Sequence, residues 1–110
     1  MDLEASFRQY VAKEPALRVR APGRVNLLGE HVDYNDGPVL PAAIDRAVRL
    51  AASPAEDGIV RLHALDLKQK TAFHLEAVES RVDLEGRPLP SWALYPAGVA
   101  WALKEANLEV

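Results

Sequence analysis

Hydrophobic and polar residues alternate along this chain with two different periods. Over residues 3–13 the apolar side chains recur at helical spacing, which predicts a short amphipathic helix that ends before Pro15. Over residues 17–21 apolar residues alternate with arginines, the pattern of a half-buried strand. Residues 47–53 predict another strand, and residues 54–58 its connection to the next one.

The second half of the chain predicts two more strands and a second helix. Residues 60–64 and residues 71–75 each alternate as strands do, and residues 80–90 are loop-like. Residues 95–107 carry an apolar helical face, and Pro96 suits the first turn of that helix. This order of elements predicts an α+β fold in which a helix packs on a mostly antiparallel sheet.

Composition excludes several classes of protein. A chain of 110 residues fits one small domain or a piece of a larger one. Its formal charge of −3 offers no basic surface, so nucleic acid and anionic membranes are poor candidate partners. Cysteine is absent, so no disulfide or thiolate metal site is possible. The start lacks the features of a signal peptide and no apolar run reaches membrane-spanning length, so we expect a cytoplasmic protein.

Residues 22–41 follow neither period and predict a loop rich in glycine and proline. This segment holds a dense set of polar residues: Arg24, Asn26, Glu30, His31, Asp33, Asn35 and Asp36. Composition alone would favour a plain solvated turn. However, the segment follows a strand and contains apolar anchors at Val25 and at residues 27–28, and loops held on a scaffold commonly carry function.

The chemistry of this segment suits a polyhydroxyl ligand. Glu30, His31 and Asp33 offer several hydrogen-bond acceptors and a switchable donor, which can take several hydroxyls of one sugar. Arg24 is a permanent cation that could face a developing phosphoryl charge. A metal site is a weaker interpretation, because adjacent residues on one loop rarely complete a coordination sphere and no second cluster exists.

Residues 23–35 read Gly-Arg-Val-Asn-Leu-Leu-Gly-Glu-His-Val-Asp-Tyr-Asn and are followed by Val-Leu-Pro at residues 39–41. This run closely resembles the signature of the galactokinase family. Residues 92–95, Trp-Ala-Leu-Tyr, resemble a second family motif, Trp-Ala-Asn-Tyr. Val32 replaces the usual threonine of the first motif, and Leu94 replaces the asparagine of the second.

The resemblance implies a member of the GHMP small-molecule kinases, with a ribosomal-S5-like α+β domain in its N-terminal half. Such an enzyme transfers the γ-phosphate of ATP, with Mg²⁺, to the C1 hydroxyl of galactose. By position, Arg24 resembles the arginine that supports the transition state, and Glu30, His31 and Asp33 resemble the galactose ligands. Trp92 and Tyr95 resemble aromatic residues near the adenine, and a packed start to the last helix is an alternative explanation for both.

The glycines at residues 23, 29, 37, 58, 86 and 98 form no clustered phosphate-binding loop. We therefore expect residues 1–110 to be an incomplete galactose-binding domain, with the phosphate loop, catalytic aspartate and Mg²⁺ ligands further on, and to be inactive alone. Two alternatives stay open: a kinase for N-acetylgalactosamine or another sugar, and a catalytically inactive galactokinase-like sensor. One short sheet face cannot cover all three of Val99, Trp101 and Leu103 in the last helix, so we expect an exposed apolar patch that favours self-association.

Overall fold

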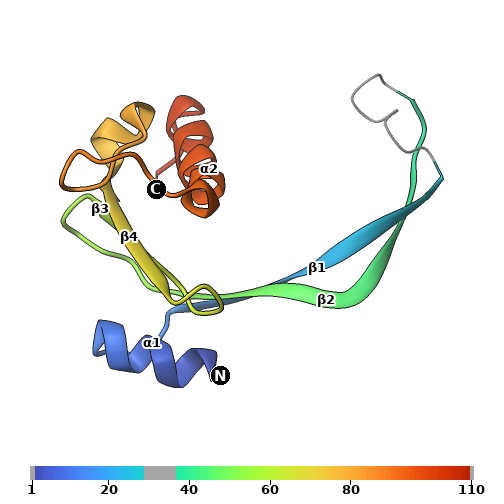
Figure 1. Ribbon diagram of the computed structural model, residues 1–110, viewed down its shortest axis with the longest axis horizontal. Helices are drawn as coiled ribbons and strands as arrows, with labels where there is room; N and C mark the ends of the chain where they lie inside the picture. Colours follow the sequence, from blue (N-terminus) through green and yellow to red (C-terminus); the bar gives the residue numbers. More distant parts are fainter. Residues whose placement is uncertain (1, 29–36, 110) are drawn as a thin grey trace. The chain divides into compact units, whose positions relative to one another are not determined.

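The computed structural model describes residues 2–28 and 37–109 (Figure 1). Contacts along the chain divide it into two compact units, Met1–Ser53 and Pro54–Val110. The first unit contains α1 (Leu3–Val11), β1 (Leu17–Leu28) and β2 (Leu40–Ala52). The second contains β3 (Ile59–Ala64), β4 (Gln69–His74), the 3₁₀ segments η2 (Leu75–Ser80) and η3 (Ser91–Ala93), and α2 (Leu94–Glu105).

Helix α1 confirms the first prediction to within two residues at its end. It begins because the Asp2 carboxylate accepts hydrogen bonds from the backbone N–H groups of Glu4 (3.0 Å) and Ala5 (3.3 Å). It ends at Ala12, which adopts a left-handed conformation (φ 60°). The guanidinium of Arg18 donates to Glu4 at 2.6 Å, so one ion pair joins α1 to β1.

Strands β1 and β2 form an antiparallel ribbon that is longer than the sequence predicts. The pattern predicted a loop over residues 22–41, but residues 22–28 and 40–41 belong to the strands. Strand β2 also begins at Leu40, seven residues before the predicted start at residue 47. The pairing register shifts between Pro22 and Arg24, next to the proline that lacks an N–H donor. Each strand of a two-stranded ribbon has an unpaired edge, and an edge can accept proline. The prediction was therefore wrong about where the loop begins and ends.

Strands β3 and β4 form a second antiparallel hairpin, with Ile59 opposite His74 and Ala64 opposite Gln69. In the part of the chain that the structure describes, the four strands make two separate two-stranded sheets. The α+β class and the antiparallel pairing are therefore confirmed, but the strands form two sheets where we expected one. Period-2 alternation identifies a strand but contains no information about its partner, and here each strand pairs with its neighbour in sequence.

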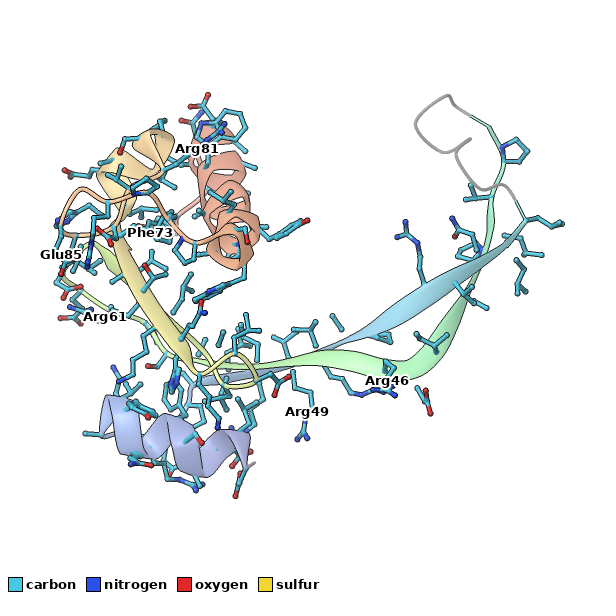
Figure 2. The ribbon with its side chains drawn as sticks, in the orientation of Figure 1. Arg46, Arg49, Arg61, Phe73, Arg81 and Glu85 are labelled. Atoms are coloured by element: carbon cyan, nitrogen blue, oxygen red, sulfur yellow. The ribbon has the colours of Figure 1, made fainter. Side chains whose placement is uncertain are left out.

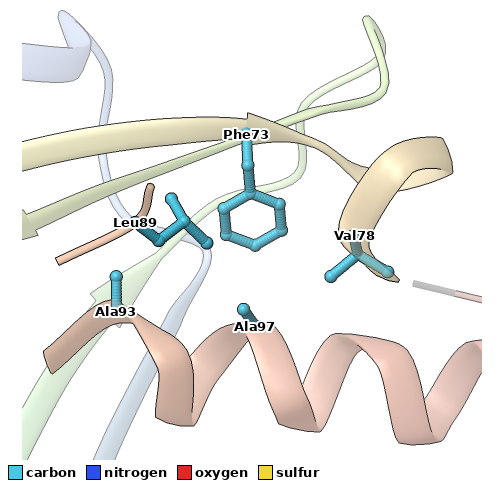
Figure 3. Packing of buried hydrophobic residues seen from close by; sticks show 5 residues of the cluster. All are labelled: Phe73, Val78, Leu89, Ala93 and Ala97. Carbon is cyan, nitrogen blue, oxygen red and sulfur yellow. The ribbon is translucent and has the colours of Figure 1, made fainter. Parts of the chain in front are cut away.

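The hydrophobic core lies in the second unit. It consists of Phe73, Val78, Leu89, Ala93 and Ala97, with Val60, Leu62 and Trp92 packed against it. Figure 3 shows the Phe73 ring reaching from β4 toward α2, between Leu89 and Val78. Lys104 of α2 donates to the backbone carbonyl of Glu76 (3.2 Å) and to the Glu79 carboxylate (3.1 Å), which fixes α2 against η2.

The loop predicted over residues 80–90 and the last helix are both present. Within the loop, the Asp83 carboxylate accepts the backbone N–H groups of Glu85 and Arg87, each at 2.9 Å. Helix α2 begins one residue before the predicted start and ends two residues before the predicted end. None of the helices formed by residues 2–28 and 37–109 is long and apolar enough to cross a membrane.

Candidate functional site

Arg24 is the one predicted site residue of the signature that lies among the described residues. It sits on β1 opposite Ala43 of β2, immediately after the register shift, and its side chain is exposed. The preceding Gly23 is packed closely, because a Cβ there would lie 3.2 Å from the side chain of Ile44. No ion pair joins Arg24 to any other described residue.

Glu30, His31 and Asp33 lie outside the described residues. Their convergence with Arg24 on one face therefore stays a prediction. The structure does bring the two described flanks of the signature together, since Asn26 of β1 pairs with Pro41 of β2. The first motif segment and the Val-Leu-Pro segment thus lie side by side on neighbouring strands.

The apolar anchors predicted for this segment are not buried. Val25 is 47% exposed, and Leu27 and Leu28 are more exposed still. Among the described residues, no second layer covers these positions of the two-stranded ribbon. The apolar side chains that alternate along β1 are therefore not buried there. The expectation that these side chains anchor a loop to a scaffold was wrong. What holds the segment is the backbone ladder between β1 and β2.

Trp92 is held firmly within the second unit. It lies in η3, packs against the core, and donates its indole N–H to the side-chain oxygen of Gln69 at 2.7 Å. Tyr95, one turn further on, is 82% exposed. The partner Gln69 was missed by sequence reasoning, because it lies 23 residues away and no local pattern connects the two.

Metal-binding chemistry finds no support in the described part of the chain. Across residues 2–28 and 37–109, no group of three or more histidine, aspartate or glutamate residues is placed to hold a metal ion.

Comparison with known proteins identifies the signature. Residues 5–54 match the galactokinase galactose-binding signature. The chain is 47% identical to a galactokinase of Streptomyces coelicolor over 94% of this chain and 26% of that protein. It is 46% identical to a galactokinase of Roseiflexus sp. over 96% of this chain and 25% of that protein. It is 42% identical to the galactokinase of Homo sapiens over 86% of this chain and 24% of that protein.

These matches define the chain first as an α+β segment that carries a galactose-binding signature. More particularly, it is homologous to galactokinases over most of its own length. The chain spans about a quarter of the length of these relatives.

Proposed function

We propose that this chain is the galactose-binding part of a galactokinase, which transfers the γ-phosphate of ATP to the C1 hydroxyl of galactose. The observation that carries the proposal is the signature match over residues 5–54, which contains every polar residue of the predicted sugar site. The three relatives described above, which match 86–96% of the chain, are each named galactokinase.

In this proposal the chain's own residues act on the acceptor side of the reaction. Glu30, His31 and Asp33 bind and orient the sugar hydroxyls, and so select the epimer. Arg24 faces the transferring phosphoryl group, where a fixed cation stabilises the charge that develops in the transition state. The exposed position of Arg24 on β1, where no carboxylate of residues 2–28 and 37–109 pairs with it, supports this role.

ATP and Mg²⁺ belong to the proposed reaction. When bound, the metal neutralises phosphate charge. No group of acidic or histidine residues in the described part of the chain is placed to hold a metal ion, and we expect the Mg²⁺ ligands beyond residue 110. We further propose that Trp92 lies near the adenine, as the family resemblance suggests.

A chimera tests the proposal directly. Residues 1–110 replace the matching quarter of the Streptomyces coelicolor galactokinase, to which they are 47% identical. We expect ATP-dependent phosphorylation of galactose in a coupled assay, with glucose and N-acetylgalactosamine as alternative acceptors. We expect none from residues 1–110 alone, because phosphoryl transfer needs groups that this sequence does not contain.

Two variants of the chimera separate the proposed roles. Asp33→Ala should weaken galactose binding by roughly ten- to a few-hundred-fold and leave ATP binding nearly unchanged, because each charge-assisted hydrogen bond contributes about 1.5–3 kcal/mol. Arg24→Ala should lower kcat more than sugar affinity. Equal losses of galactose and ATP affinity in the Asp33 variant would mean that this residue supports the fold. A chimera that folds but prefers N-acetylgalactosamine would refute the assignment of substrate.

A further inference from the structure

The ribbon formed by β1 and β2 carries an excess of positive charge. Its two strands contain five arginines, at residues 18, 20, 24, 46 and 49, and one acidic residue, Asp45. Among the described residues, Arg18 alone of the five forms ion pairs, with Glu4 at 2.6 Å and with Glu14 at 4.0 Å. Four guanidinium groups of this ribbon therefore have no acidic partner in the described part of the chain.

Two of these unpaired arginines face each other. Arg20 of β1 lies directly opposite Arg49 of β2 in the antiparallel register. Opposite residues of such a ladder project from the same face, and like charges in this position repel. Because side chains alternate along a strand, Arg18 projects from the same face as Arg20. Figure 2 shows Arg49 projecting from β2 on the side of the ribbon where α1 lies.

The arginine pair lines a groove of about 210 Å³ between α1 and the ribbon. The lining residues are Leu3, Glu4, Arg18, Val19, Arg20, Arg49 and Leu50. The one carboxylate in this lining, Glu4, accepts a hydrogen bond from Arg18, which lowers the pKa of Glu4 and keeps it ionised. Glu4 therefore offsets the charge of Arg18, and no other described carboxylate lines the groove to offset the charges of Arg20 and Arg49.

We propose that Arg20 and Arg49 bind a phosphate-bearing anion in this groove. A planar guanidinium donates two parallel hydrogen bonds to phosphate oxygens, and two facing guanidinium groups match the double charge of a phosphate monoester. The groove is small and has a carboxylate in its lining, which suits a single small anion better than an extended polyanion. This site is separate from the proposed role of Arg24, and testing it needs neither galactose nor turnover.

The test uses the 110-residue chain and two probes, inorganic phosphate and pyrophosphate. Each is titrated at constant ionic strength, with sodium chloride as the blank, and followed through the backbone amide resonances of residues 18–20 and 49–50. We expect saturable shifts with a dissociation constant on the order of 1 mM. Tighter binding of pyrophosphate identifies a polyphosphate ligand, and equal affinities identify a single phosphate group.

Matched variants decide whether the pair is responsible. The double variant Arg20→Gln/Arg49→Gln should raise the dissociation constant about tenfold or more. Arg46→Gln removes another unpaired arginine of β2 that does not line the groove, and it should bind phosphate as the parent chain does. Shifts no larger than those with chloride, or an equal loss of binding in the Arg46 variant, would overturn the proposal.

Melting temperature provides a second readout. In phosphate-free buffer Arg49→Gln should raise Tm, because it removes the repulsion between the two guanidinium groups. Added phosphate should stabilise the parent chain and leave the double variant unchanged. A lower Tm of Arg49→Gln without phosphate would show that the Arg49 side chain stabilises the fold. That result would contradict the interpretation that Arg20 and Arg49 repel each other.

Discussion

Replacing Phe73 by alanine should remove most of the stability of the second unit. Phe73 is 1% exposed, and it is the one large side chain among the described residues that is completely buried. The other buried core residues are Val78, Leu89 and three alanines, all with smaller side chains than phenylalanine. Phe73 therefore contributes the largest fully buried side chain of this unit.

The magnitude follows from the packing in Figure 3, where the ring fills the space between β4 and α2. Truncation of a buried phenylalanine to alanine costs about 3–5 kcal/mol, from lost transfer free energy and from the cavity left behind. A core of this size rarely supplies more than about 3–5 kcal/mol in total. Phe73→Ala should therefore leave the second unit largely unfolded at 25 °C, and Phe73→Leu should lose only part of that free energy.

Hydrogen exchange resolved by residue, together with urea denaturation, measures this effect. Amides of β3, β4 and α2 should lose protection in Phe73→Ala. The control is Leu67→Ala, since Leu67 is 53% exposed in the turn between β3 and β4 and its truncation should change stability by no more than about 0.5 kcal/mol. A loss below about 1 kcal/mol in Phe73→Ala, or an equal loss in the control, would refute the reasoning.

Two further predictions concern the surface of the second unit. A hydrogen bond from Arg61, assisted by the backbone N–H of Ile59, lowers the pKa of Asp57 from 3.8 to about 2. The stability that this lowered pKa gives the folded chain is present above the ordinary pKa of Asp57 and disappears as pH falls through the folded pKa. The Tm difference between the parent chain and Asp57→Asn should therefore shrink from pH 4 to pH 2, and a difference that stays constant would contradict this reasoning. Val99 is 60% and Trp101 46% exposed on α2, so the chain should self-associate in light scattering and Trp101→Ser should weaken this; a strict monomer at high concentration would contradict it.

Local patterns predicted the elements well and their pairing poorly. The helix over residues 3–13 and the strand over residues 60–64 are present with ends shifted by one or two residues, because both depend on periodicity within a single segment. The extension of β1 beyond Pro22 could not be predicted in this way. Proline and glycine interrupt a strand in a central position, but they are accepted where one edge is unpaired, and edge position is a property of the assembled sheet.

The same distinction applies to the candidate site. Arg24 is recognisable because its neighbours in sequence form the signature, and the structure places it on β1 with an exposed side chain. The hydrogen bond between Trp92 and Gln69 connects residues far apart in sequence, so only the fold shows it.

This bond also limits how Trp92 can take part in nucleotide binding. The indole has a single polar hydrogen, and Trp92 already donates it to Gln69 at 2.7 Å. Contact with adenine would therefore have to use the face of the ring, by stacking, and could not add a hydrogen bond from the indole nitrogen. Trp92 also packs against the hydrophobic core. The orientation of its ring is therefore set by Gln69 and by the core cluster before any ligand binds. The two interpretations of Trp92, a packed start to the last helix and a residue near adenine, are thus compatible, because the packing would present a fixed ring to the base.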